Sequence, residues 1–411
     1  MSSSEWIEVE LKDISIDGKG SYGIGASAVE YSKELYTYLR ITDINDDGTL
    51  NREGLKSVDD SEAEKYLLKS NDIVFARTGN STGKSYFYDG KDGELVYAGF
   101  LIKFSLNSEK VNPRYMRYYT LSEEYNHWVN SFSTGSTRGN INAKTYASMK
   151  INLPPREQQD FLVNILSSLD EKIELNNQMN KTLEEMAQAL FKRWFVDFEF
   201  PNEDGEPYKS SGGEMVDSEL GMIPKGWKVG YLDDIIEIYD AKRKPLSSRQ
   251  RANMAKNYPY YGAASLVDYV ENYLFDGIYV LISEDGANVV DADGYPLVQY
   301  VWDKFWVNNH AHIVKGKNGY SEEHIYILVK NTNMRSIVTG AVQPKINQAN
   351  LKSVNIVIAQ AIIIEKFNDL LTSVFNQYRS NAIENEKLKE MRDILLPKLM
   401  SGEIRVTDLQ N

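Results

Sequence analysis

Residues 154–200 read PPREQQDFLVNILSSLDEKIELNNQMNKTLEEMAQALFKRWFVDFEF, and this stretch decides the fold. It opens with two prolines, which suit the first turn of a helix, and no glycine or proline follows before Pro201. Apolar residues recur at alternating steps of four and three, as in a coiled-coil seam. We expect a spacer helix of roughly 40 residues, about 60 Å long, rather than an ordinary core helix. Its seam consists of Leu162, Leu166, Leu169, Ile173, Asn176, Asn180, Leu183, Ala187, Leu190 and Trp194.

The same stretch recurs 205 residues later without a gap. The match begins at Thr134 and Thr339 and runs through both helical stretches. A long internal repeat outweighs any single motif in deciding the architecture. The second seam consists of Phe367, Leu371, Val374, Tyr378, Asn381, Asn385, Leu388, Arg392, Leu395 and Leu399.

Each seam contains two asparagines, which cost stability but fix the register of a coiled coil. The globular segments that join the helix ends favour an antiparallel pair about a pseudo-two-fold axis. In that arrangement Asn176 faces Asn385 and Asn180 faces Asn381. The four amides then satisfy one another inside an apolar seam.

The predicted fold class is α+β. Two α/β domains are separated by two long helices, which pair as an antiparallel coiled coil and give a pseudo-two-fold internal repeat. The length of 411 residues suits two or three domains. The predicted boundaries are 1–153 for the first domain, 154–200 for the central helix, 201–226 for a linker rich in Pro, Gly, Ser and acidic residues, 227–358 for the second domain, 359–400 for the C-terminal helix and 401–411 for a tail.

Aromatic and β-branched runs predict strands in the first domain, and Gly/Asn clusters predict loops. The strands are expected at 36–41, 72–76 and 100–104, a short helix at 112–121, and loops at 77–83 and 133–140. The second domain restarts this plan, because YVLISEDGAN at 279–288 echoes DIVFARTGNS at 72–81. The loops diverge while the helices match, which is the pattern of two domains that bind different targets.

The composition excludes several classes of protein. The chain contains no Cys, so disulfides and thiolate metal sites are impossible, and a reducing cytoplasm is expected. The N-terminus lacks the features of a signal peptide. No apolar run reaches transmembrane length, so we expect no membrane contact.

The net charge of −13 argues against free, nonspecific DNA binding, which depends on neutralised phosphates. A local basic segment is compatible with DNA contact. Five positive charges fall within residues 242–251, followed by Tyr258, Tyr260 and Tyr261. A solvated loop is the alternative reading of this segment.

Two motifs resemble catalytic loops without matching them. GNSTGKS at 79–85 has three residues between its glycines, whereas a phosphate-binding loop has four, so we interpret it as a strand-to-strand loop. NYPYYG at 257–262 resembles the Asn-Pro-Pro-Tyr motif of amino-methyltransferases, but position 258 is Tyr and no Gly-rich cofactor loop accompanies it.

His310 and His312 alternate on a predicted strand and would share one face. A metal site requires further ligands, so a polar or buried histidine pair is the preferred interpretation. No catalytic residue and no metal ligand is assigned to this chain.

The segments LPPREQQ, ILSSLDEKIELNNQMNKTLEEMAQALFKRWFVDFEFP and SELGMIPKGWKV, with the C-terminal LKEMRDILLPKLMSGEIRV, carry a resemblance. They are similar to the conserved regions of specificity subunits of type I restriction-modification systems. The resemblance covers the whole chain in plan. One departure is that the second helix lacks the leading Pro-Pro-x-x-Glu-Gln and has IVIAQAII instead.

The resemblance implies a non-catalytic protein in which each variable domain is a target-recognition domain for one half of a split double-stranded DNA sequence. The helices would set the gap between the half-sites and dock two modification subunits, and restriction subunits would join the complex. It also implies no cofactor in this chain, since S-adenosylmethionine, ATP and Mg²⁺ would belong to the partner subunits.

Base reading would come from loop side chains, with Arg or Lys to guanine and Asn or Gln to adenine. Half-sites one helical turn apart lie about 34 Å from each other, within the reach of the spacer helix. The candidate DNA contacts are Lys19, Tyr22, Arg77, Lys84, Arg138 and Asn142 in the first domain and Lys242, Arg243, Lys244, Arg249, Arg251 and Lys345 in the second.

Two other classes stay open from the residues alone. A stand-alone methyltransferase or nuclease with degenerate motifs would bind its cofactor as a purified chain. A coiled-coil adaptor that does not bind DNA would show no sequence-dependent DNA binding even with partners. The residues do not give the DNA target or the length of its gap.

Overall fold

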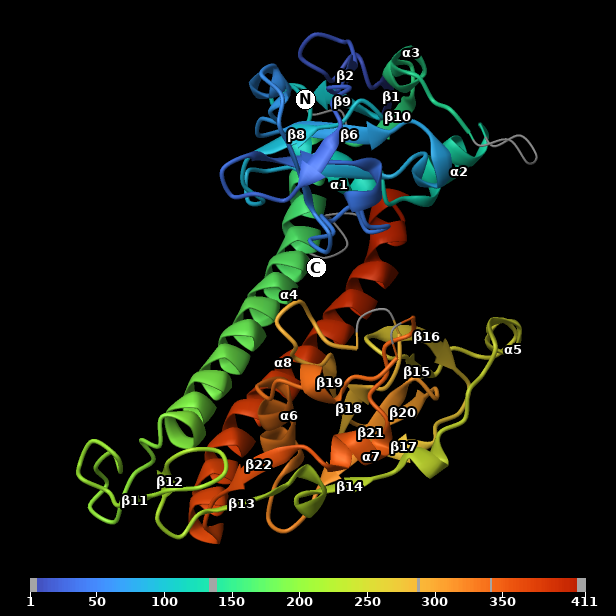
Figure 1. Ribbon diagram of the computed structural model, residues 1–411. Helices are drawn as coiled ribbons and strands as arrows, with labels where there is room; N and C mark the ends of the chain where they lie inside the picture. The colour runs from blue at the N-terminus through green and yellow to red at the C-terminus, as the bar shows by residue number, and fades with distance from the viewer. Residues whose placement is uncertain (1–5, 133–138, 287–288, 341, 405–411) are drawn as a thin grey trace. The chain divides into compact units, whose positions relative to one another are not determined.

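The computed structural model describes residues 6–132, 139–286, 289–340 and 342–404 (Figure 1). It divides into two compact units. The first unit comprises Met1–Glu174 and Glu384–Asn411, and the second comprises Leu175–Ile383. The long helices α4 (Arg156–Phe191) and α8 (Ala361–Met400) each contribute to both units. The domain boundaries given above stay predictions.

An antiparallel four-stranded sheet carries the first unit. Its central strand, β6, is buried along its whole length. Ile73 and Phe75 pack into one core and Val74 and Ala76 into another, as the alternation of side chains along a strand requires. The spatial order is β2 (Ser21–Tyr22), β9 (Leu101–Ser105), β6 (Asp72–Ala76) and β7 (Ser85–Tyr88).

The remaining elements of the first unit cover this sheet. A second sheet has the order β3 (Ala28–Glu30), β5 (Lys56–Val58), β4 (Tyr36–Leu39) and β8 (Leu95–Tyr97), and β1 (Ile7–Glu10) pairs with β10 (Lys150–Leu153). The helices are α1 (Pro113–Tyr119), α2 (Glu123–Asn130) and α3 (Ala143–Ala147), with 3₁₀ turns η1 (Ile41–Asp43), η2 (Ala63–Tyr66) and η3 (Gly79–Ser81).

The second unit repeats the plan. Its antiparallel sheet has the order β14 (Ile236–Ile238), β21 (Ala311–Gly316), β18 (Tyr279–Ser283) and β19 (Val298–Val301). The second sheet has the order β16 (Leu266–Val270), β15 (Tyr258–Tyr261), β20 (Lys304–Val307) and β17 (Phe275–Asp276), and β13 (Lys228–Tyr231) pairs with β22 (Asn355–Ile358). The helices are α5 (Ser248–Ala252), α6 (Glu322–Lys330) and α7 (Gln348–Lys352), with 3₁₀ turns η5 (Leu232–Asp234), η6 (Asp240–Lys242) and η7 (Arg335–Ile337).

The repeat extends to individual hydrogen bonds. The Asp13 carboxylate accepts the backbone N–H of Glu10 at 2.9 Å, and the Asp234 carboxylate accepts that of Tyr231 at 2.8 Å. Asn142 caps α3 and Asn347 caps α7, each through its own side-chain Oδ1. The predicted correspondence of 72–81 with 279–288 is confirmed for the strands, because β6 and β18 are the equivalent central strands, while residues 287–288 lie outside the described residues.

The two long helices run antiparallel within each unit. In the first unit, Arg392 of α8 pairs with Asp170 of α4 at 3.2 Å, and Glu384 pairs with Lys172 at 3.1 Å. A step toward the C-terminus of α4, from Asp170 to Lys172, therefore corresponds to a step toward the N-terminus of α8, from Arg392 to Glu384. The two helices run in opposite directions.

The second unit shows the same direction at the asparagine pair. The Asn381 amide donates to Asn180 Oδ1 at 2.9 Å, as predicted, and Asn180 Nδ2 donates to the Tyr378 carbonyl at 3.1 Å. Farther along α4, Phe191 meets Phe367. Asn176 and Asn385 are buried, and their predicted pairing stays a prediction.

The predicted seam positions are all buried or half-buried along both helices. The fully buried members include Leu166 and Leu371, while Leu169 and Leu183 are half-buried. The remaining seam residues are likewise buried or half-buried, and they are Leu162, Ile173, Asn176, Asn180, Ala187, Leu190, Trp194, Phe367, Val374, Tyr378, Asn381, Asn385, Leu388, Arg392, Leu395 and Leu399.

Two expectations about local structure were wrong. The central helix does not continue to Phe200, since α4 ends at Phe191 and a π-helical turn follows over Lys192–Val196. Phe198 then takes a positive φ of 61°, and the aromatic run wraps around Trp227. The strand predicted over 36–41 ends at Leu39, where Asp43 caps a 3₁₀ turn.

The predicted linker also contains ordered structure. It includes a hairpin of β11 (Met215–Val216) and β12 (Ile223–Pro224), and Tyr208 stacks on Phe200. Aromatic contacts hold this polar segment against the second unit. No helix in the described part of the chain is long and apolar enough to span a membrane.

Candidate nucleic-acid interface

The central strands of the two units end in equivalent loops. In the first unit, Arg77 follows β6, its N–H donates to the Phe100 carbonyl at 3.0 Å, and its carbonyl accepts the N–H of Ile141 at 2.9 Å. In the second unit, Glu284 follows β18 and makes the same two bonds, to His310 at 2.9 Å and from Ile346 at 2.8 Å. Arg77 and Glu284 therefore occupy the same place in the repeat with opposite charge.

Aromatic stacking holds the side chain of Arg77. Its guanidinium carbon lies 5.0 Å from the centroid of the Tyr22 ring. The Tyr22 hydroxyl in turn accepts the N–H of Ala143, at the start of α3, at 3.1 Å. The structure thus brings together three predicted contacts, Tyr22, Arg77 and Asn142, at one edge of the first unit.

Lys19 and Lys84 are the other candidates of the first unit that the structure describes. Lys19 is exposed. Lys84 forms an ion pair with Asp46 at 2.7 Å and donates to the Ile44 carbonyl at 3.2 Å. The loop 79–85 joins β6 to β7, as predicted. Asn142 uses its side-chain oxygen to cap α3, and Arg138 lies outside the described residues.

At the equivalent edge of the second unit, charged side chains bind one another. Glu284 pairs with Arg243 and, at 3.0 Å, with Lys345. Arg243 also lies 3.4 Å from Asp240 and donates to the Ala311 carbonyl at 2.8 Å. The side chains of Arg243 and Glu284 are only 14% and 10% exposed, so these charges are tied into the fold.

His312 completes this network. Its Nδ1 lies 2.6 Å from Asp240 Oδ2 and its Nε2 lies 2.8 Å from the Ile346 carbonyl. Both ring nitrogens therefore face oxygen atoms, one of the Asp240 carboxylate and one of the Ile346 carbonyl. Burial raises the pKa of Asp240, but the hydrogen bond from His312, the Ile313 N–H and the Arg243 charge outweigh it and leave that pKa below its ordinary value.

The carboxyl of Glu284 responds in the same way. Burial raises the pKa of Glu284, but hydrogen bonds from Arg243 and Lys345 and the charge of His312 lower it by more. The net shift of this pKa is therefore downward. Asp240, Glu284 and His312 offer ligand atoms within 4.8 Å of one another. Arg243 and Lys345 already balance these carboxylates and both ring nitrogens are engaged, so the set does not fit a metal ion.

The predicted histidine pair was wrong in one respect. His312 lies in β21 and is buried, whereas His310 precedes the strand, has a side chain 47% exposed, and bonds Asp285 at 2.6 Å. The strand begins only at Ala311, so the two rings do not share a strand face.

The basic segment 242–251 is less free than its sequence indicates. Arg251 is 13% exposed and pairs with Asp268 at 3.0 Å, and Lys256 pairs with the same carboxylate at 2.8 Å. These cations lower the pKa of Asp268 to about 2, with the hydrogen bond from Lys256 as the largest cause. Lys242, Lys244 and Arg249 are exposed and remain the accessible cations of the segment.

Sequence reasoning missed Asp240, Glu284 and Asp268, which neutralise these cations from distant positions in the chain. It also missed Phe100, which is 59% exposed beside Arg77. One difference was visible in the sequence. When DIVFAR is aligned with YVLISE, Arg77 and Glu284 occupy the same position with opposite charge.

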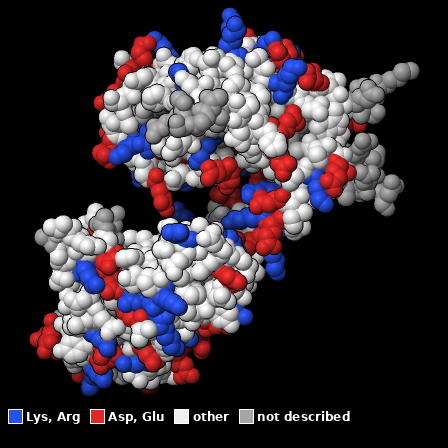
Figure 2. All heavy atoms as spheres, turned by 90° about the vertical axis from the view of Figure 1, so that its right-hand side faces the viewer, with Lys and Arg blue, Asp and Glu red and all other residues white. Residues whose placement is uncertain are grey.

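The surface agrees with the acidic composition. Figure 2 shows Lys and Arg interspersed with Asp and Glu, with broad uncharged areas between them. On this face, the described Lys and Arg residues form no extended cationic track for a phosphate backbone. Any DNA contact on it therefore depends on individual side chains.

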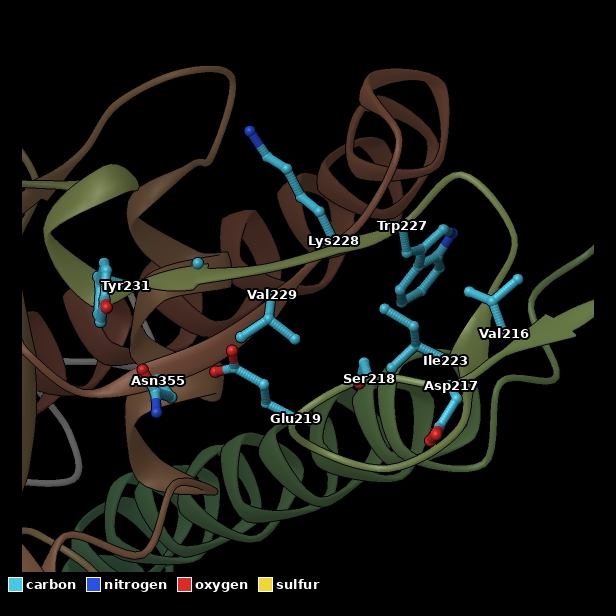
Figure 3. Close-up of a pocket in the computed structure, with 11 residues that line it drawn as sticks. Val216, Asp217, Ser218, Glu219, Ile223, Trp227, Lys228, Val229, Tyr231 and Asn355 are labelled. Carbon is cyan, nitrogen blue, oxygen red and sulfur yellow. The ribbon is translucent and has the colours of Figure 1, made fainter.

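A pocket of about 420 Å³ lies in the second unit between the β11–β12 hairpin and the ribbon of β13 and β22 (Figure 3). In Figure 3, Glu219 and Val229 point toward one another across it. Its charged lining residues are Asp217, Glu219 and Lys228. The excess of carboxylates makes it unsuited to bind phosphate.

Comparison with known proteins identifies the scaffold. Residues 3–185 and 224–390 match the family model described as the type I restriction modification DNA specificity domain. The chain belongs to this family. Its members are non-catalytic specificity subunits of type I restriction-modification systems, so the expected family, fold class and absence of catalysis are confirmed.

Individual relatives support the assignment. The chain is 24% identical to the HindI specificity subunit of Haemophilus influenzae, across 98% of this chain and 100% of that protein. It is 28% identical to the MjaIX specificity subunit of Methanocaldococcus jannaschii, across 73% of this chain and 71% of that protein. The crystal structure of an S subunit from M. genitalium superposes with a TM-score of 0.51 at 15% identity, covering 97% of both chains, and thus shares the fold.

Proposed function

We propose that each unit of this specificity subunit reads one half of a bipartite DNA sequence. The observation that carries the proposal is the pair of equivalent loop edges, at Arg77 and at Glu284, which share backbone hydrogen bonds and differ in side-chain chemistry. A conserved scaffold with divergent loops suits two recognition domains with separate targets.

The long helices would set the distance between the half-sites and dock two modification subunits, with restriction subunits joining the complex. A helix of 36 residues rises about 54 Å, which is more than one turn of DNA. S-adenosylmethionine, ATP and Mg²⁺ would be bound by the partner subunits, and the complex would act on DNA in the cytoplasm.

Exchange of one recognition domain tests the assignment. The chain is co-expressed with its modification subunit, and methylated positions are mapped across the host genome. Replacing residues 227–345 with those of another family member should change one half of the methylated sequence and leave the other half intact. A change in both halves would contradict independent reading.

The purified single chain is the control for catalysis. It should transfer no methyl group, and it should support sequence-specific methylation only with its partner. Methyl transfer by the chain alone would favour a stand-alone methyltransferase, and a complex without sequence preference would favour an adaptor.

The role of the helices as a spacer has its own test. Inserting seven residues after Gln178 and seven after Ile383 preserves the seven-residue period of both seams and lengthens each helix by about 10 Å. The gap between half-sites should grow by about three base pairs at 3.4 Å each. An unchanged gap would exclude the helices as the element that sets the spacing.

A further inference from the structure

The backbone of Arg77 is fixed on both sides. Its N–H and carbonyl bond to Phe100 and Ile141, and the next residue, Thr78, forms an antiparallel bridge with Asn140. Two loops distant in sequence thus hold one residue at the end of the central strand. Such a position is better defined than the tip of a free loop.

The guanidinium of Arg77 meets no acceptor among the described residues. No hydrogen bond or ion pair to it exists among the residues that the structure describes, and its Nε is buried without a partner. A buried donor without an acceptor costs free energy, so it requires an explanation at this place in the fold. An acceptor supplied by a ligand provides one.

Arg77 is half-buried, and its two aromatic neighbours are exposed. The Tyr22 ring beneath it is 42% exposed and Phe100 is 59% exposed. The residue that takes the place of Arg77 in the second unit, Glu284, is buried and bound by two cations. At this position of the repeat, the first unit has an unpaired guanidinium among the described residues and the second unit has a paired carboxylate.

We propose that Arg77 reads a guanine in the half-site of the first unit and that Tyr22 is its positioning residue. The inference rests on the proposed function, because it assumes that this unit binds DNA. A guanidinium fork matches the O6 and N7 acceptors of guanine in the major groove. The stacked ring limits the orientations of the fork, which reduces the freedom lost on binding.

The experiment measures methylation by the full complex of this chain with its modification subunit. Duplexes carry each of the four bases in turn at every position of the mapped half-sites. Arg77→Met should reduce the preference for guanine at one position of the first half-site by about 10- to 100-fold. All positions of the second half-site should keep their preferences.

Two substitutions of Tyr22 separate positioning from folding. Tyr22→Leu removes the ring and should relax the same position that Arg77→Met relaxes. Tyr22→Phe keeps the ring, loses only the bond from Ala143, and should retain most of the preference for guanine. Arg52→Met is the matched control, because Arg52 is an exposed arginine of the same unit paired with Asp92. It should leave the methylated sequence unchanged.

Each contrary outcome has a definite reading. An unchanged half-site in Arg77→Met overturns the inference while the proposed function stands. An equal loss of methylation on all sequences means a phosphate contact and also overturns it. If Arg77→Met forms no complex, identical sequence preferences in Tyr22→Leu and Tyr22→Phe overturn it. Absence of sequence-specific methylation by the unmodified complex would instead refute the proposed function.

Discussion

The loop edges at Arg77 and at Glu284 have the same backbone hydrogen bonds but different surroundings for their charged side chains. Both residues end the central strand of their sheet and make the same pair of backbone hydrogen bonds. Arg77 rests on an aromatic ring with its charge available to a ligand. Glu284 lies among Arg243, Lys345 and His312, and its carboxylate is paired with these side chains inside the fold.

The difference shows how a repeated scaffold separates stability from recognition. Equivalent backbone bonds hold the loops in both units, so the side chains at the edge are not needed for the path of the chain. In the first unit the cation of Arg77 has no charged partner among the described residues. In the second unit the carboxylate of Glu284 belongs to a buried ion network, and the exposed cations lie elsewhere, at Lys242, Lys244 and Arg249.

The largest expected effect is on stability at the Glu284 edge. Glu284→Gln removes one member of a buried network, leaves Lys345 without its carboxylate and leaves Arg243 with Asp240 alone, which should cost about 3 kcal/mol. Arg77→Met removes a cation without a charged partner among the described residues and should cost below about 1 kcal/mol. Hydrogen exchange of the amides in β18 and β6, measured on the full chain, reports the two units separately. Equal losses would mean that the two edges do not differ as described.

The next effect concerns acid. Burial lowers the pKa of His324 to about 3 from an ordinary 6.5. Between these values the unfolded chain binds a proton that the folded second unit excludes. The stability is therefore full above about pH 6.5 and is lost as the pH falls toward 3, by about 1.4 kcal/mol per pH unit at most.

This acid sensitivity should distinguish the units, because His127, the histidine of the first unit, is exposed. From pH 7 to pH 5, the free energy of opening from amide hydrogen exchange should fall by about 2 kcal/mol more in β18 than in β6. His324→Phe should reduce this difference, since the ring packs among Phe195, Phe367 and Tyr320. An unchanged acid response in that variant would exclude His324 as its source.

The smallest effect tests the seam. Asn180 and Asn381 share a hydrogen bond, so Asn180→Leu and Asn381→Leu should be coupled by about 1 kcal/mol in a double-mutant cycle on thermal unfolding. Asn176→Leu and Asn381→Leu should be nearly additive, because a parallel register alone would bring those residues together. Stronger coupling of the second pair would contradict the antiparallel arrangement.

Much of the fold follows from the sequence. The period of the seam between Leu162 and Trp194 predicted the long helix, and the repeat at 205 residues predicted its partner helix and the second domain. The globular segments that join the helix ends, together with the family resemblance, predicted the antiparallel direction. The helix period did not predict where the central helix ends, because aromatic packing decides that end. Around Trp227, contacts from Phe195, Phe198 and Phe200 replace the end of the predicted helix.

The candidate interface was less accessible to sequence reasoning. Composition and loop position selected Tyr22 and Arg77, and the structure places them in contact. They also selected Arg243 and Arg251, whose neutralising partners Glu284 and Asp268 lie 41 and 17 residues away. Periodicity and spacing report the face of an element on which a residue lies, because that depends on neighbours in the chain. Whether its charge is available depends on side chains that only the tertiary fold brings within a few ångströms.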